Sequence, residues 1–315
     1  MTITELLESV RRVEVRTNRL VNDTMVGAYL SHFKGRGMDF EELREYIPGD
    51  EVRDIDWNVT YRMGRPFVKR YREERELAMV LALDVSASSL FGSLRRTKRE
   101  FAAEIAGTLA ISAARSSDKV ALLLFSDQVE LFLPPRKGRR HILRLIREML
   151  FFEPKHRGTN IPAALAFLNH VLHRRSIIFL LTDFLHSVVQ GQQSTVLGPP
   201  SAAPGRGARD TIQEIGLTNA RHDLICLHLH DPRESVLPPA GLLTVEDAET
   251  GELLEVDSSR AIVRERFART NAERLAELDR ALRRAGVDTL SFSTAEPFAQ
   301  TLQAFFETRP GRRRG

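Results

Sequence analysis

The sequence predicts an α/β protein of the Rossmann-like class, with a doubly wound, mainly parallel central sheet. Two observations predict it. Short runs of consecutive apolar residues recur along the chain, and most neighbouring runs are separated by segments with apolar residues at helical spacing. A strand that is apolar along its whole length is typical of a sheet that helices cover on both faces. The alternation of such strands with helices favours parallel pairing.

The apolar runs locate the strands, and the periodic segments locate the helices. Six buried strands are expected, at 77–84, 120–125, 129–133, 176–182, 223–230 and 287–292. Helices are expected around 101–112 and at 139–151, 161–173 and 259–284. The helix at 259–284 is long and charged, with an apolar seam at Phe267, Leu275, Leu278 and Leu282.

Two insertions interrupt the alternation of strands and helices. Residues 187–210 are rich in Gly, Pro, Ser and Ala and bury too little apolar surface to offset the entropy of ordering, which predicts a mobile loop. Residues 242–256 alternate on either side of Thr250-Gly251, which predicts a β-hairpin. Both insertions fall inside the main domain, expected over 77–309.

The first 76 residues are expected to form a small irregular unit in front of that domain. Within 1–76, helical spacing predicts a surface-packed helix at 3–20, and alternation predicts a half-buried strand at 66–71. Residues 310–315 form a basic tail. With Arg309 they make the only obvious basic cluster of the chain, and a solvated chain end is the expected role.

Composition excludes several classes of protein. Lys+Arg 46 against Asp+Glu 42 leaves a net charge of +4 spread along the chain, so no nucleic-acid partner is expected. One cysteine, Cys226, excludes an internal disulfide framework, and its apolar surroundings predict a buried, inert thiol. No stretch reaches about 18 uncharged apolar residues, so no transmembrane segment is expected. The N-terminus has no secretory signal pattern, and a cytoplasmic protein is the expectation.

Polar oxygen groups follow the apolar strands at the points where ligands collect in open parallel sheets. Asp84, Ser86 and Ser88 close the first buried strand, Asp183 closes the fourth, and Thr159 precedes a helix. All five side chains offer oxygen, and none offers nitrogen or sulfur. Oxygen ligands of mixed charge suit a hard divalent cation, Mg²⁺ first and Mn²⁺ or Ca²⁺ next. Two carboxylates and three hydroxyls do not complete an octahedron without water or an outside ligand.

Each of these groups also has a simpler interpretation. Ser and Asp after a strand commonly cap the next helix, and Thr159 could do the same. A strand pair of histidines, His228 and His230 with His222 nearby, could suggest a metal, but without a third ligand at recognisable spacing a structural role is favoured.

The five oxygen residues resemble a known site. The D-x-S-x-S of Asp84, Ser86 and Ser88, a later Gly-Thr and an Asp closing a later strand are similar to the metal-ion-dependent adhesion site of von Willebrand factor type A domains. The resemblance covers about 77–309. It implies that Ser86, Ser88 and Thr159 bind Mg²⁺ directly, that Asp84 and Asp183 act directly or through water, and that a partner's Asp or Glu fills the open position.

The N-terminal unit resembles a second signature. The segment 35–57, GRGMDFEELREYIPGDEVRDIDW, is similar to the sequence that precedes the type A domain in the bacterial "domain of unknown function 58" (DUF58) proteins. These are often grouped with MoxR-type AAA+ ATPases, so the resemblance implies a MoxR-type ATPase or its client as partner. The charged residues of this segment suit either a solvated salt-bridge network or a docking face, and Trp57 within the charged run favours an anchored segment.

Three hypotheses follow. The first is a non-enzymatic, Mg²⁺-dependent protein-interaction module that serves as adaptor or co-factor of a MoxR-type AAA+ ATPase. The second is a Mg²⁺-dependent hydrolase, a phosphatase or nuclease, using the same acidic strand ends. It is disfavoured because Ser86 stands where an aspartyl-phosphate enzyme needs a second acid, and because the P-loop and G-x-S-x-G motifs are missing. The third is a scaffold whose metal site is vestigial.

Overall fold

The computed structural model describes residues 38–73, 78–94, 96–185, 206–248 and 251–309, together with Val13, Thr17, Leu20 and Val21. Most of the helix expected at 3–20 lies outside these residues. The described Val13, Thr17 and Leu20 are helical, and the Thr17 hydroxyl donates to the Val13 carbonyl at 2.7 Å. The basic tail at 310–315 and most of the loop expected at 187–210 also lie outside the described residues.

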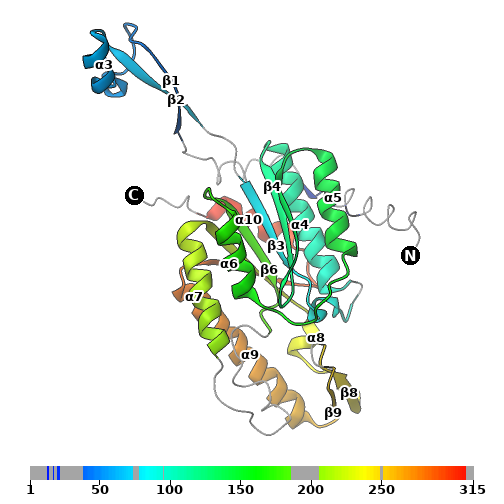
Figure 1. The fold of residues 1–315 in the computed structure, drawn as a ribbon. Coiled ribbons are helices and arrows are strands. Elements are labelled where there is room, and N and C mark those ends of the chain that lie inside the picture. Colours follow the sequence, from blue (N-terminus) through cyan, green and yellow to red (C-terminus); the bar gives the residue numbers. More distant parts are fainter. Residues whose placement is uncertain are drawn as a thin grey trace.

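A mainly parallel six-stranded sheet forms the centre of the protein (Figure 1), as the apolar runs predicted. Its order is β10-β7-β6-β3-β4-β5, and only the β4–β5 pair is antiparallel. The strands are β3 (Ala78–Asp84), β4 (Lys119–Phe125), β5 (Val129–Arg136), β6 (Ile177–Thr182), β7 (Asp223–His230) and β10 (Asp288–Ser293). Each of the six expected strands corresponds to one of them.

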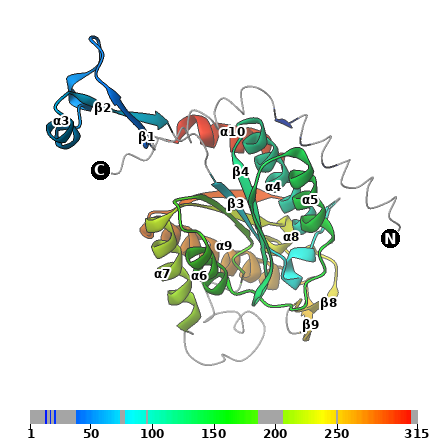
Figure 2. The ribbon, with the colours of Figure 1, turned by 45° about the horizontal axis from the view of Figure 1, so that its top comes forward.

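Helices cover both faces of this sheet (Figures 1 and 2). One face packs against α4 (Lys98–Arg115), α5 (Arg139–Phe151) and α10 (Ala299–Thr308). The other packs against α6 (Ile161–Val171), α7 (Arg206–Arg221) and α9 (Ala261–Arg284).

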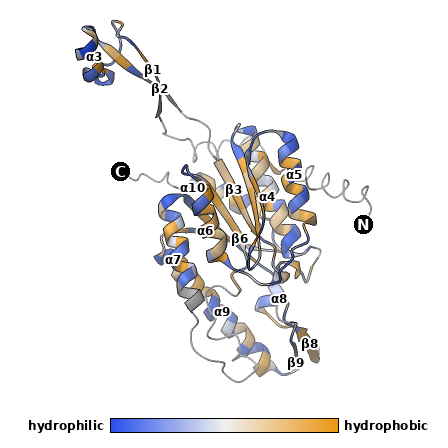
Figure 3. Ribbon diagram, viewed as in Figure 1, coloured by the Kyte–Doolittle hydropathy of each residue, from blue (hydrophilic) through white to orange (hydrophobic). Residues whose placement is uncertain are grey.

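Successive residues of β3 point to opposite cores, which explains why this strand is apolar throughout. Met79 and Leu81 belong to the first core, and Val80 and Ala82 to the second. Figure 3 shows the same hydrophobic colour along β3 and β6. Each fully buried Leu or Met contributes about 1.5–3 kcal/mol through burial, so both helical layers are held to the sheet by the hydrophobic effect.

The order of the strands creates a switch point between β3 and β6. From β3 the chain proceeds through β4 to β5 on one side, and then returns to build β6, β7 and β10 on the other. In open α/β sheets the crevice at such a point, beyond the carboxyl ends of the strands, is where ligands bind. Asp84 ends β3, and Asp183 directly follows β6.

Two short elements lie near the same end of the sheet. The helix α8 (Pro232–Ser235) follows β7, and a hairpin of β8 (Leu242–Glu246) and β9 (Leu253–Asp257) follows α8. The hairpin agrees with the one expected at 242–256, and Gly251 adopts φ 75° in its turn, where L side chains are strained.

Two expectations about the chain's polar segments were wrong. The loop expected at 187–210 ends earlier, because 206–210 form the first turn of α7. Arg309 is not part of a solvated cluster: it is 9% exposed, and its guanidinium forms ion pairs with Asp223 and Asp288. The sequence pattern could not show that Arg309 lies against the starts of β7 and β10.

The N-terminal unit is more regular than expected. It contains an antiparallel pair of β1 (Met38–Glu45) and β2 (Phe67–Glu73), the 3₁₀ turn η1 (Val52–Asp54) and the helix α3 (Trp57–Met63). Figures 1 and 2 show it standing apart from the sheet domain. Charged residues stand at adjacent positions in the sequence of β1 and obscure the alternation, which is why pattern analysis found only the second strand.

No helix among the described residues is long and apolar enough to cross a bilayer.

Candidate metal site at the carboxyl ends of β3 and β6

The turn after β3 gathers the first three predicted residues. The Asp84 carboxylate accepts a hydrogen bond from the Ser86 backbone N–H at 2.9 Å, which folds the chain back on itself as an Asx-type turn. The Ser86 and Ser88 hydroxyl oxygens then lie 3.1 Å apart. All three side chains are buried, with exposed fractions of 5% or less. The D-x-S-x-S spacing therefore brings these oxygens together locally.

The tertiary structure brings Thr159 and Asp183 to this turn. The Thr159 hydroxyl donates to Asp84 Oδ2 at 3.4 Å, and the Thr182 hydroxyl donates to the same oxygen at 2.7 Å. Asp183 follows Thr182 directly, is buried, and accepts from the Leu185 N–H at 3.1 Å. All five residues predicted from the sequence thus gather around the switch point.

The helix-capping interpretation does not account for the two hydroxyls at element starts. The side chain that caps α6 belongs to Asn160, which accepts from the Ala163 N–H at 3.0 Å and leaves Thr159 directed to Asp84. Ser86 precedes the 3₁₀ turn η2 (Ala87–Leu90) without a side-chain capping bond. Both hydroxyls therefore lie at the carboxyl ends of β3 and β6, which we call the rim of the sheet, and neither caps a helix.

A small cavity lies beside the two strand ends. Its volume is about 10 Å³, close to the space that one water molecule needs. Asp84, Thr182, Asp183 and Lys98 contribute to its wall. Both acidic side chains of the predicted site thus line this cavity, together with apolar side chains such as Leu181 and Leu229.

Lys98 and Glu234 belong to this cluster, although pattern analysis did not find them. The Lys98 ammonium, 2% exposed, donates to Asp183 Oδ2 at 2.6 Å and also to Glu234 of α8. One signal was present in the sequence: the capping box of Thr97 and Glu100 fixes Lys98 as the first residue of α4. A cation at that position opposes the helix dipole, a local conflict that indicates a functional or tertiary constraint.

The buried charges shift one another's pKa values. Burial, with the nearby Asp183 charge as second cause, raises the pKa of Asp84 to about 6. Burial alone would also raise the pKa of Asp183, but the Lys98 ammonium outweighs it and holds that pKa below its ordinary value. Burial would lower the pKa of Lys98, and its two carboxylate partners raise it instead. Lys98 is therefore a charged ammonium inside the fold.

The chemistry of the donors fits a hard divalent cation. Carboxylate and hydroxyl oxygens from Asp84, Ser86, Ser88 and Thr159 converge without nitrogen or sulfur. Within the described residues no group of three or more His, Cys, Asp or Glu side chains is arranged to hold a metal. A cation at this rim would therefore depend on the hydroxyls as well as the carboxylates.

Two of the three histidines lie on β7, the strand that pairs with β6. His228 and His230 stack with ring centroids 5.4 Å apart, and the Ser291 hydroxyl contacts both rings. His222 precedes the opposite end of β7, where the Ser176 N–H donates to its ring. The three histidines therefore do not converge. Cys226 is fully buried, as predicted, and burial raises the pKa of its thiol.

The charged residues of the N-terminal signature hold that unit together. Arg44 binds both carboxylate oxygens of Asp50, at 2.8 and 2.7 Å. Asp56 caps α3 and pairs with Lys69 of β2 at 3.0 Å.

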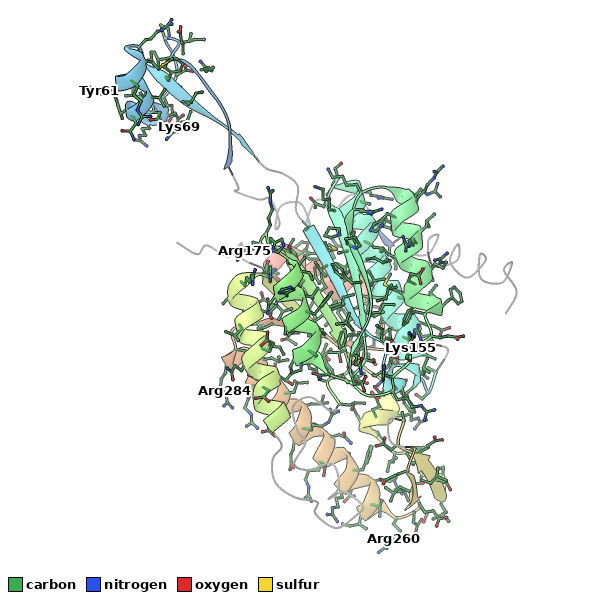
Figure 4. The ribbon with its side chains drawn as sticks, in the orientation of Figure 1. Tyr61, Lys69, Lys155, Arg175, Arg260 and Arg284 are labelled. Atoms are coloured by element: carbon green, nitrogen blue, oxygen red, sulfur yellow. The ribbon has the colours of Figure 1, made fainter. Side chains whose placement is uncertain are left out.

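Trp57 within the charged run favoured an anchored segment, and in the structure its exposed fraction is 65%. Tyr61, one turn later, is 90% exposed (Figure 4). The salt-bridge interpretation is thus present in the structure, and the docking interpretation stays a prediction.

The fold and the rim together define an α/β protein with an oxygen-lined cluster at the switch point of its sheet. The model of the family described as "Protein of unknown function DUF58" matches residues 42–277, and the chain belongs to this family. An uncharacterized protein of Mycobacterium tuberculosis, Rv1480, is 28% identical over 308 residues, covering 97% of this chain and 90% of the relative. A protein of Mycobacterium avium, MAV169, is 25% identical over 179 residues, covering 56% of this chain and 93% of its own length.

Solved structures are similar at low scores. A conserved hypothetical protein, BatB, from Bacteroides thetaiotaomicron has a TM-score of 0.42 and 15% identity, covering 72% of this chain and 96% of its own. An aerotolerance-related membrane protein of Bacteroides fragilis has a TM-score of 0.45 and 15% identity, covering 74% and 100%. The SpRpn10 VWA domain has a TM-score of 0.37 and 13% identity, covering 72% and 93%.

Proposed function

We propose that this protein is a non-enzymatic, Mg²⁺-dependent protein-interaction module, a cytoplasmic adaptor or co-factor of a MoxR-type AAA+ ATPase. The observation that supports the metal-dependent part is the meeting of Asp84, Ser86, Ser88 and Thr159 oxygens at the switch point, beside the cavity that Asp183 also lines. The ATPase partner rests on the resemblance of the N-terminal signature.

The hydrogen bonds of the rim prepare the hydroxyls for a cation. A hydroxyl that donates its proton to a carboxylate keeps its oxygen lone pairs for another ligand. Thr159 donates to Asp84 in this way. Asp84 thereby orients Thr159 through one oxygen and the Ser86 backbone through the other.

In the proposed site Ser86, Ser88 and Thr159 bind the cation, and Asp84 and Asp183 contribute directly or through water. The bound cation, Mg²⁺ or else Mn²⁺ or Ca²⁺, supplies a Lewis-acidic position for a carboxylate of the partner. A partner carboxylate on the cation would couple the two binding events, so that partner binding and cation binding would reinforce each other.

The same rim offers little to a hydrolase. The residue two positions after Asp84 is Ser86, a hydroxyl at the position where an aspartyl-phosphate enzyme needs a second acid. The hydrolase hypothesis is tested by phosphatase and nuclease assays with Mg²⁺ on the purified protein, and we expect no turnover. The vestigial-site hypothesis is tested by calorimetric titration with Mg²⁺, where heat of binding is expected.

The central experiment is an affinity pull-down from the native host, run once with Mg²⁺ and once with EDTA. Asp84→Ala removes the carboxylate that orients Ser86 and Thr159, so we expect loss of the Mg²⁺-dependent partner while the circular dichroism spectrum keeps its folded shape. Asp279→Ala, which removes a carboxylate from a surface ion pair of α9, is the matched control and should retain the partner. Undiminished capture by Asp84→Ala, or by the wild type in EDTA, would refute the proposal.

A further inference from the structure

Lys98 is a charged side chain in a place where isolated charges are not tolerated. Its exposed fraction is 2%, and an unpaired ammonium at that depth would cost several kcal/mol. Among the described residues, two carboxylates offset this cost: Asp183 at 2.6 Å and Glu234 of α8. Asp183 is at the same time one of the five residues of the proposed cation site. In the proposed site the Asp183 carboxylate therefore interacts with two positive charges: the Lys98 ammonium and a cation from solution.

The charges of the cluster do not balance. Asp84, Asp183 and Glu234 face a single ammonium in contact, that of Lys98. With these four groups ionised, two negative charges remain before longer-range charges are counted. Arg274 of α9 adds a longer-range positive charge that faces Asp183 and Glu234. The wild-type cluster is therefore partly neutralised from within and still attracts a cation.

We propose that Lys98 is the resident counter-ion of this site and sets its affinity for divalent cations by competing for Asp183. The proposal rests on the proposed function, because it assumes that the cation binds at Asp84, Ser86, Ser88 and Thr159. In the metal-free protein Lys98 neutralises Asp183 and allows the fold to persist without a cation. When a cation binds, Asp183 is shared between the cation and Lys98, and the like charges repel each other.

Glu234 makes this exchange feasible. Its Oε1 accepts from Lys98 while its Oε2 accepts from the Asp231 N–H at 2.9 Å, which fixes Glu234 at the start of α8. Asp231 is itself held by the Ser93 N–H at 3.0 Å and the Thr294 hydroxyl at 2.8 Å. Lys98 therefore keeps one rigidly positioned carboxylate when Asp183 turns to the cation. Without Glu234 the ammonium would be committed to Asp183.

The test compares two variants whose expected shifts have opposite signs. Lys98→Met keeps an unbranched side chain of similar length and removes the competing charge. Its dissociation constant for Mg²⁺ should fall about tenfold, as expected for removing a unit charge a few ångströms from the ligand. Glu234→Gln leaves the ammonium with Asp183 as its only carboxylate partner and should raise the dissociation constant about tenfold. Isothermal titration calorimetry with MgCl₂ measures both.

Thermal unfolding gives a second, independent readout. In EDTA the Lys98→Met variant should melt below the wild type, because Asp183 and Glu234 lose their counter-ion. Saturating Mg²⁺ should then raise its melting temperature more than that of the wild type. Lys137→Met is the matched control, because Lys137 is exposed just after β5, at the end of the sheet opposite the site, and should change neither quantity.

The possible outcomes separate this proposal from the proposed function. Equal Mg²⁺ affinity in the wild type, Lys98→Met and Glu234→Gln would overturn the counter-ion role and leave the metal site standing. Binding by Lys98→Met but not by the wild type would support the counter-ion role and argue against a metal-dependent function of the natural protein. Absence of binding even in Lys98→Met would overturn both. If Lys98→Met does not fold, the shift in Glu234→Gln alone decides.

Discussion

The two ends of the central sheet both carry acids that pair with a buried cation, but they are built differently. At the amino ends of β7 and β10, Arg309 binds Asp223 at 2.7 and 3.2 Å and pairs with Asp288 at 2.8 Å. At the carboxyl ends of β3 and β6, the Lys98 ammonium is divided between Asp183 and Glu234. Figure 4 shows Arg175, which precedes β6, and Lys155, which precedes the Thr159 loop, at these opposite ends.

The difference separates a structural cluster from a site prepared for a ligand. The Arg309 guanidinium is a planar fork that satisfies carboxylates in fixed geometry. Its partners Asp223 and Asp288 are also partly hydrated, with side chains 16% and 37% exposed. At the other end the acids are more deeply buried and outnumber the ammonium. A buried cluster with an excess of one charge is typical of functional sites, where stability is lower than the fold alone would allow.

The largest expected effect comes from disrupting the Arg309 cluster at the amino ends of β7 and β10. Arg309→Met leaves Asp223 and Asp288 without their shared cation and should lower the free energy of unfolding by about 3 kcal/mol. Urea denaturation measures this, and the loss should be the same with Mg²⁺ and with EDTA, because the cluster lies at the end of the sheet away from the cation site. A loss that Mg²⁺ repairs would mean that the two ends are not independent.

Removing an acid from the carboxyl ends of β3 and β6 should change the free energy of unfolding in the opposite direction. Asp84→Asn replaces a buried carboxylate, whose charged form the fold disfavours, by a neutral group of the same shape. At pH 8 in EDTA this should raise the free energy of unfolding by about 2 kcal/mol. In saturating Mg²⁺ the advantage should shrink or reverse, since the wild type then gains binding energy. Destabilisation by Asp84→Asn in EDTA would show that its hydrogen bonds matter more than its charge.

The smallest expected effect concerns acid sensitivity at the same end. His228 pairs with Thr182 across the strands, and burial, with His230 as second cause, lowers its pKa to about 3. A lowered histidine pKa means that the neutral ring is favoured in the fold, so stability is present above the unfolded pKa near 6.5 and declines below it. Between pH 7 and 5.5 the wild type should lose about 1 kcal/mol relative to His228→Gln.

Denaturant titrations of both proteins at the two pH values measure that difference. Parallel pH profiles would mean that His228 is solvated or protonated in the fold.

The sequence located most of the elements because their signals are local. The apolar runs of β3, β4, β6 and β7 contain little else, so hydrophobicity alone identifies them. Pattern analysis missed β1, α3, α7 and α10, and in two of these, β1 and α7, the local signal conflicts with the element that forms. In β1, charged residues at adjacent sequence positions mask the alternation, and α7 begins inside a stretch whose composition is that of a loop.

The sequence by itself determined which residues supply oxygen ligands, since D-x-S-x-S forms its own turn through the Asp84 carboxylate and the Ser86 backbone. Only the tertiary structure decided that β3 lies beside β6, which places Asp183 and Thr159 at that turn. It also decided that Lys98 and Glu234 meet there, although 136 positions separate them. The physical reason is that the sequence pattern around a charged residue does not show whether its side chain is buried. Whether a lysine is solvated or buried depends on which distant carboxylates the fold brings to it.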